Sequence, residues 1–121
     1  MFHKRIKSFG FAWQGLRDLF LSQPNAWIHL ALGIFACLLG VALGLSPVEW
    51  ATLFLTIGAV FCLEALNTAL EYLTDLVSPE YHALAGKAKD AAAAAVLLGA
   101  FASILVGLCL FGPKLLALIG R

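Results

Sequence analysis

Three long apolar runs dominate the chain. Among Asp, Glu, Lys, Arg and His, residues 28–48 contain only His29, residues 50–70 contain only Glu64, and residues 91–113 contain none. Each run is long enough to cross about 30 Å of hydrocarbon as an α-helix. The pattern therefore predicts an all-α membrane protein with transmembrane helices over residues 28–48, 50–72 and 91–113.

The first 25 residues show a different pattern, with large apolar side chains at spacings of three or four. These side chains are Phe2, Ile6, Phe9, Trp13, Leu16 and Phe20, and most charged residues fall elsewhere around the helix. Such an arrangement is typical of an amphipathic helix that lies in the membrane surface. A soluble arm would leave this aromatic stripe in water, so we expect residues 1–25 to form a surface helix.

The connections and charges predict how the chain crosses the membrane. The short link Gly44-Leu45-Ser46-Pro47 favours a tight hairpin between the first two spans. Basic residues avoid this link and precede the first span or lie between the second and third, at Lys4, Arg5, Lys7, Arg17, Lys87 and Lys89. The positive-inside rule then predicts that the N-terminus and a loop over residues 72–90 lie in the cytoplasm. Lys114 and Arg121, at the opposite end of the third span, oppose this orientation, but they are two basic residues against six.

Composition agrees with a single membrane domain over residues 1–121. The chain is 62% hydrophobic and 12% charged, with a mean hydropathy of +0.94. Eight basic against seven acidic residues provide no basic field, which argues against nucleic-acid binding. Cys37, Cys62 and Cys109 lie in apolar runs without metal-ligand spacing, and we expect them to be buried thiols.

Small residues recur every four positions in two of the apolar runs. Gly40 and Gly44 form a GxxxG pattern, and a longer ridge contains Ala91, Ala95, Gly99, Ser103 and Gly107. Ridges of this kind let helix backbones approach closely. They indicate close packing, either within one chain or between copies in an oligomer.

Polar residues gather at one end of the second apolar run. Helical periodicity puts Glu64, Asn67, Glu71 and Asp75 on one face of an otherwise apolar helix. Carboxylates aligned in this way repel one another unless a proton, a cation or a basic group lies among them, and oxygen ligands suit Mg²⁺. The pattern indicates a cation-binding site near the inner membrane interface.

Simpler interpretations exist for parts of this stripe. Glu71, Asp75 and Asp90 are also explained as ordinary charges at helix ends in water, and Asn67 as a hydrogen-bonding contact between helices. Glu64 resists such an explanation because the residues on either side of it are apolar. Ionisable residues at membrane depth are costly and usually functional.

At these residues the sequence resembles the prokaryotic diacylglycerol kinase and undecaprenol kinase family of small trimeric membrane enzymes. The segment from Glu64 to Asp75 reads EALNTALEYLTD and is similar to the family signature. A second block, SPEYHALAGKAKD, ends at Lys89 and Asp90, and KSFGFAWQGLRDLF resembles the surface helix of the family. The resemblance covers nearly the whole chain.

The resemblance implies a homotrimeric helical bundle that phosphorylates a membrane lipid, undecaprenol or diacylglycerol, with ATP and Mg²⁺ at the cytoplasmic side of a bacterial inner membrane. Neighbouring subunits would complete each site. Glu64 corresponds to the general base, Asn67 to a residue lining the same site, and Glu71 to a magnesium ligand. The positions corresponding to residues near the nucleotide are Lys4, Lys7, Trp13, Asp75, Lys89 and Asp90.

Two positions depart from the pattern of the family. A second magnesium-binding glutamate corresponds to Gln23, whose amide adds no charge, and Trp27 replaces an arginine in an Asn-x-Arg-Ile-His stretch. His29 in that stretch fits either a hydrogen-bonding role at a helix boundary or a role with substrate. The departures leave a non-catalytic membrane scaffold as an alternative. A cation or proton transporter is a further alternative, although the acids cluster at one side of the membrane.

Overall fold

The computed structural model describes residues 1–120, which form four helices joined by short links. They are α1 (Phe2–Ser22), α2 (Pro24–Leu43), α3 (Pro47–Val77) and α4 (Ala83–Ile119), and no strand occurs among the described residues. The helices α2, α3 and α4 are each long and apolar enough to cross a membrane. The predicted all-α class with three candidate spans is therefore confirmed.

Local sequence signals account for the ends of these helices. Pro24 and Pro47 each start a helix at a position where no backbone N–H is needed. Ser46 caps α3 in a capping box, because its hydroxyl accepts from the Glu49 N–H at 3.3 Å while its own N–H donates to the Glu49 carboxylate at 2.8 Å. Gly44 ends α2 in the left-handed region, at φ 70°, a conformation that favours glycine.

Two helices extend past the apolar runs that predict them. The 31 residues of α3 and the 37 residues of α4 are longer than the roughly 20 residues that span a bilayer. The segment 72–90, expected as a loop, is mostly helical, and only residues 78–82 are outside a helix. The expectation of a loop is wrong because helical hydrogen bonds form inside the segment and continue beyond the hydrophobic run.

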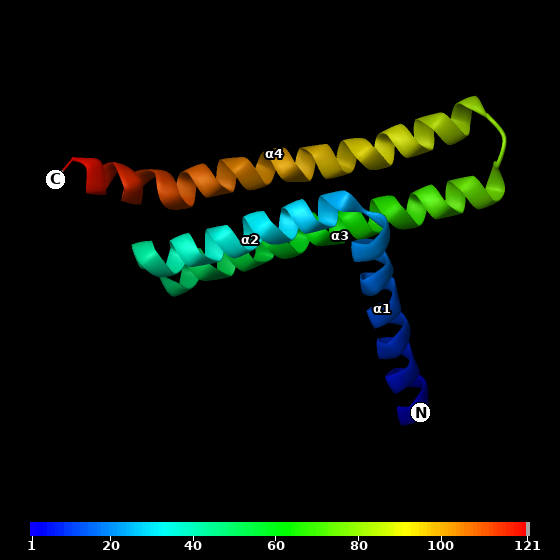
Figure 1. Ribbon diagram of the computed structural model, residues 1–121, viewed down its shortest axis with the longest axis horizontal. Coiled ribbons are helices and arrows are strands. Elements are labelled where there is room, and N and C mark those ends of the chain that lie inside the picture. Colours follow the sequence, from blue (N-terminus) through cyan, green and yellow to red (C-terminus); the bar gives the residue numbers. More distant parts are fainter. Residues whose placement is uncertain (121) are drawn as a thin grey trace.

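The three long helices lie side by side, and α3 and α4 form the most extensive contact (Figure 1). Gly99 of α4 allows this approach, because a Cβ atom at this position would overlap the Leu63 side chain of α3. A Cβ at Gly40 would lie 2.8 Å from Leu45, so this glycine also packs inside its own chain. Within the GxxxG pattern, Gly40 therefore serves packing while Gly44 serves the turn.

We expect Gly99→Ala to lower the stability of the folded chain by about 1 kcal/mol, because Leu63 must leave its preferred position. Gly107→Ala is the matched control, since a Cβ there meets nothing within 4 Å. Unfolding in detergent, followed by circular dichroism, measures the difference. Equal stability of the two variants would contradict the close packing of α3 on α4 at Gly99.

The core within one chain is small. Buried apolar residues form one cluster at the end of the bundle that holds the α2–α3 turn, made of Leu45, Leu53, Leu110 and Phe111. Most other large apolar side chains are exposed, as suits helices surrounded by lipid or by other copies. Cys62 and Cys109 are exposed and Cys37 is half-buried, so the predicted burial of the cysteines is wrong for a single chain.

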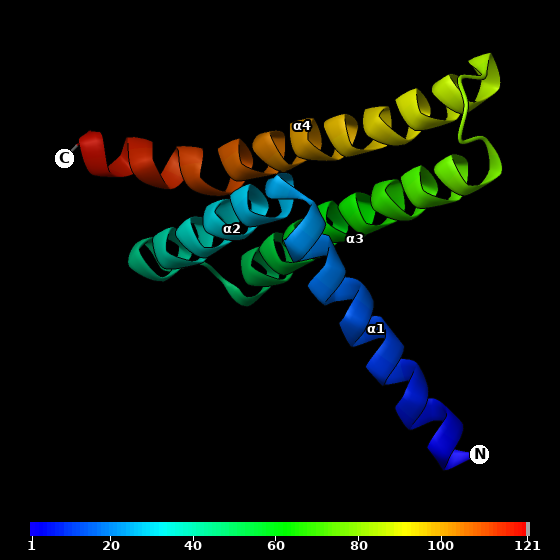
Figure 2. The ribbon, with the colours of Figure 1, turned by 45° about the vertical axis from the view of Figure 1, so that its right-hand side comes forward.

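The amphipathic helix α1 leaves the bundle at a steep angle (Figures 1 and 2). Its last turn lies beside the middle of α3, where α2 begins, and its N-terminal end extends far from the other helices. The C-terminal half of α3 and the N-terminal half of α4 continue past the joint between α1 and α2. These projecting halves carry the polar residues of the stripe.

Candidate active site

The polar stripe continues the buried face of α3. The buried residues of this helix follow helical spacing from Leu53 and Val60 to Glu64 and Asn67. Glu64 is only 1% exposed, and its backbone carbonyl accepts a hydrogen bond from the Thr68 hydroxyl at 3.0 Å. The membrane-side part of the stripe, Glu64 and Asn67, therefore faces the protein, whereas a lipid-facing carboxylate would be exposed in a single chain.

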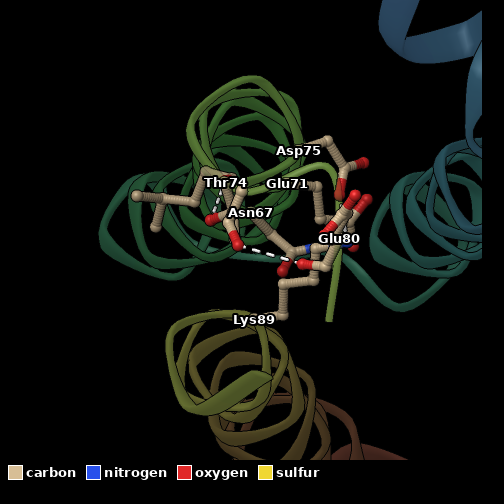
Figure 3. Close-up of polar contacts among 8 residues, drawn as sticks. Asn67, Glu71, Thr74, Asp75, Glu80 and Lys89 are labelled. Carbon is tan, nitrogen blue, oxygen red and sulfur yellow. Dashed lines mark hydrogen bonds and ion pairs between the residues drawn. The ribbon is translucent and has the colours of Figure 1, made fainter. Parts of the chain in front are cut away.

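Asn67 and Glu71 interact directly along this face. The Asn67 amide nitrogen donates to a carboxylate oxygen of Glu71 at 3.1 Å. Figure 3 shows Asn67, Glu71 and Asp75 on the same side of α3. The contact holds the Glu71 carboxylate in place and turns the amide oxygen of Asn67 away from it.

The stripe is joined to α4 by an ion pair. The Lys89 ammonium group contacts the Asp75 carboxylate, and Figure 3 shows Lys89 extending from α4 toward α3. Both side chains are partly exposed, at 41% and 61%, so the pair contributes less than about 1 kcal/mol to stability. The main effect of the pair is to place the positive charge of Lys89 beside the row of acidic side chains on α3. Asp90 is exposed on the following position of α4.

Two buried oxygen atoms of the stripe have no hydrogen-bond partner within the described chain. They are Oε2 of Glu64 and Oδ1 of Asn67. Leaving a buried acceptor unsatisfied costs roughly 1–3 kcal/mol, and more when the group is charged. Such groups call for a proton, a cation or a donor from another molecule, so this pair is the strongest indication of a functional centre.

The candidate metal ligands come from separate parts of the chain. Glu71 lies on α3, whereas Gln23 is the half-buried residue between α1 and α2. Among residues 1–120, no group of three or more His, Cys, Asp and Glu side chains is close enough to hold a metal ion. The oxygen donors of the stripe suit a hard cation such as Mg²⁺, but a single chain does not assemble a full ligand set.

The candidate nucleotide residues of α1 lie away from the stripe. Trp13 is 69% exposed, and Lys4 and Lys7 are exposed near the free end of the helix. Lys7 lies about 16 Å along the helix axis from Asp18, the residue of α1 that contacts Tyr72 of α3. One chain therefore aligns Glu64, Asn67, Glu71 and Asp75 along α3, with Lys89 paired to Asp75, and leaves Lys4 and Lys7 apart from them.

One contact at the site has no counterpart in the sequence patterns. The Tyr72 hydroxyl donates to a carboxylate oxygen of Asp18 at 2.7 Å, across 54 residues of chain. It attaches the end of α1 to α3 one turn beyond Thr68. Both residues lie in segments that resemble the family, but neither segment predicts the contact, because 54 residues separate the two side chains and helical periodicity relates only residues of the same helix.

An apolar cavity of about 260 Å³ lies next to the stripe, between α2, α3 and α4. Val60 and Phe61, which precede Glu64 by about one turn, form part of its wall, and His29 lines it from α2. The His29 ring meets the edge of Phe61 at a centroid distance of 6.3 Å. His29 thus lies at the border between the apolar cavity and the polar stripe.

Comparison with known proteins identifies the family. The sequence profile described as prokaryotic diacylglycerol kinase matches residues 10–111, which include the whole stripe and Lys89 and Asp90. The chain belongs to this family. The match therefore covers α1 from Gly10 onward, all of α2 and α3, and most of α4.

Members of the family with curated names are similar over most of the chain. The undecaprenol kinase of Bacillus subtilis is 42% identical over 110 residues, which are 91% of this chain and 89% of that protein. The diacylglycerol kinase of Synechocystis is 46% identical over 115 residues, covering 94% and 66%. The diacylglycerol kinase of Escherichia coli K12 is 29% identical over 104 residues, covering 86% and 85%. The names of these relatives thus give two different lipid substrates, undecaprenol and diacylglycerol.

Proposed function

We propose that this protein is a lipid kinase that transfers the γ-phosphoryl group of ATP to the hydroxyl of a membrane lipid, undecaprenol or diacylglycerol. The observation that carries the proposal is Glu64, a buried carboxylate with an unpartnered oxygen beside the unpartnered amide oxygen of Asn67. An enzyme of this class needs a base within hydrogen-bond reach of the lipid hydroxyl. Glu64 supplies one at the level where the apolar cavity meets the polar stripe.

The other residues of the stripe have separate roles in this proposal. Asn67 holds Glu71 through its amide nitrogen and offers its free oxygen to the reacting groups. Asp75 positions Lys89, whose ammonium group is available as a point charge for a phosphate, and Asp90 lies beside it. Phosphoryl transfer depends mainly on alignment and on charge stabilisation, and these residues provide both.

The donor set supports Mg²⁺ as the metal, with Glu71 and Gln23 as the ligands of this chain. The supporting observation is that the uncompensated polar atoms of the stripe are all oxygens, the ligand type of a hard cation. When bound, the ion would neutralise charge on the phosphate oxygens of ATP. Gln23 contributes a neutral oxygen where the resemblance implies a glutamate, so Glu71 supplies the only ligand charge of the pair.

The incomplete site supports a homotrimer with shared active sites. Lys4, Lys7 and Trp13 lie on the part of α1 that projects from the bundle and are free to reach the stripe of a neighbouring copy. The exposed apolar faces of the three spans leave room for such neighbours. With the N-terminus and residues 78–82 at the cytoplasmic side of a bacterial inner membrane, the candidate nucleotide residues would lie on the side of the ATP pool.

The decisive experiment is transfer of labelled phosphate from ATP by the purified protein in mixed micelles with Mg²⁺. Parallel reactions contain undecaprenol, diacylglycerol or no added lipid. Transfer to one lipid well above the lipid-free reaction establishes the activity and names the substrate. Failure with both lipids, in folded and oligomeric protein, would refute the kinase and favour the non-catalytic scaffold, with Gln23 and Trp27 as the changes to examine.

Lys89→Met is expected to raise the KM for ATP about tenfold, because a phosphate loses a point charge. The KM for the lipid should change little, and stability by less than about 1 kcal/mol, because the pair with Asp75 is partly exposed. Lys87→Met is the control, an exposed lysine without an ion pair in the described chain. If both variants change the KM for ATP equally, Lys89 has no specific contact with the nucleotide.

A further inference from the structure

The joint between α1 and α2 contains a backbone carbonyl that the helix itself cannot satisfy. Helix α1 ends at Ser22, α2 begins at Pro24, and Gln23 between them is extended, with φ −117° and ψ 108°. The carbonyl of Phe20 would pair with the N–H four residues later in a continuous helix, but that residue is Pro24, which has none. The carbonyl therefore needs a donor from elsewhere.

Trp27 supplies that donor. Its indole N–H donates to the Phe20 carbonyl oxygen at 2.8 Å. Its ring also meets the ring of Phe20 edge-on, at a centroid distance of 5.1 Å and an interplanar angle of 70°. Trp27 is thus bound to the last turn of α1 through both a hydrogen bond and an aromatic contact.

The same joint rests on α3 close to Glu64. Phe20 packs on Phe61 at a centroid distance of 5.9 Å, and Phe61 precedes Glu64 by about one helical turn. Leu19 and Ala26, on either side of the joint, are 2% and 0% exposed. A displacement of Trp27 would therefore move the last turn of α1 relative to the turn of α3 that carries Glu64.

An interfacial tryptophan has a simpler role as a membrane anchor, and Trp27 is 58% exposed. An anchor directs its N–H toward water and lipid headgroups. Here the N–H is used within the protein, on a carbonyl that Pro24 leaves without its helical partner. The anchor role does not account for this geometry.

We propose that Trp27 is a positioning residue that locks the α1–α2 joint and thereby fixes the surface helix against α3 beside Glu64. The inference rests on the proposed kinase function, because the groups it positions are Gln23 in the joint and the candidate nucleotide residues farther along α1. Trp27 touches none of the reacting groups. It acts through the orientation of α1.

The test is Trp27→Phe, which keeps an aromatic ring while removing the N–H donor together with part of the indole, the same loss that the control variant below makes elsewhere. Trp50→Phe is the matched control, since Trp50 lies at the other end of the bundle, stacks on Phe54, and makes no indole hydrogen bond within the described chain. Hydrogen exchange of the backbone amides measures the joint directly. Loss of one hydrogen bond should raise exchange in residues 17–23 about fivefold in Trp27→Phe and leave Trp50→Phe unchanged.

Kinetics in the same micelles separate positioning from general damage. We expect Trp27→Phe to raise the KM for ATP about fivefold, while kcat and the KM for lipid stay close to wild type. If the wild-type protein transfers phosphate, two results would overturn the role of Trp27. One is unchanged exchange in residues 17–23 of Trp27→Phe, and the other is an equal effect in Trp50→Phe. If the wild-type protein transfers no phosphate to either lipid, the proposed function fails, and the role of Trp27 in it fails as well.

Discussion

Glu64→Gln is expected to lower the rate of phosphate transfer at least about a hundredfold, the usual contribution of a general base. Glutamine has nearly the same shape and fills the same buried position, but its amide does not accept a proton from the lipid hydroxyl. Glu64 is 1% exposed, and no water-exposed carboxylate of the stripe can take over its position. Initial rates with labelled ATP in mixed micelles measure the loss.

Glu80→Gln is the matched control for this variant. It makes the same Glu-to-Gln change at an exposed position in the link between α3 and α4. Circular dichroism and size-exclusion chromatography show whether both variants keep the fold and the oligomeric state of the wild type. A Glu64→Gln protein that retains most of the activity would remove Glu64 from the role of base.

Hydrophobic patterning was sufficient to predict the class of fold. The apolar runs are long and nearly free of charge, so a helix is the only element that satisfies their backbone groups inside a bilayer. The Pro and Gly residues of the first turn mark the end of α2 and the start of α3 correctly. For these features, one local signal decides the structure.

Features that depend on packing or on solvent were not predictable in the same way. Hydropathy marks where a helix leaves the membrane, but not where its hydrogen bonds stop, and α3 and α4 therefore extend into the segment expected as a loop. The exposure of Cys62 and Cys109 depends on how few helices one chain contributes to the bundle. In a membrane protein, an apolar side chain is equally well accommodated by lipid and by the protein core, so hydrophobicity does not predict its burial.

The sequence predicted contacts among the polar residues where a single helix carries them. Helical spacing alone puts Asn67 within reach of Glu71, and the structure contains that hydrogen bond. The contact of Asp75 with Lys89 depends on the length of the link between two helices, and the contact of Asp18 with Tyr72 on the angle of the surface helix. Periodicity carries no information about either quantity.

The projecting surface helix connects these observations. A chain that held all its candidate groups on α3 would need no other copy, but the basic residues of α1 extend away from the stripe that would need them. In the proposed homotrimer, the basic residues of α1 would instead reach the acids of a neighbouring copy. The proposal therefore predicts that activity depends on the oligomer.

Glu71→Gln is expected to raise the Mg²⁺ concentration needed for half-maximal activity at least about tenfold, because one ligand charge is lost from the metal site. Gln23 is already neutral, so no other charge remains in the ligand pair of this chain. The glutamine oxygen still accepts the hydrogen bond from Asn67, which preserves the local geometry. A titration of Mg²⁺ at saturating ATP and lipid measures the shift.

The KM for the lipid should stay close to wild type in Glu71→Gln, since the proposed function assigns the lipid hydroxyl to Glu64, about two helical turns away along α3. Glu80→Gln again provides the comparison, because it removes one charge from the same end of the bundle without touching the stripe. A raised lipid KM with an unchanged Mg²⁺ requirement would place Glu71 on the lipid side of the site. The metal ligands would then have to come from Asp75, Asp90 and the surface helix of a neighbouring copy.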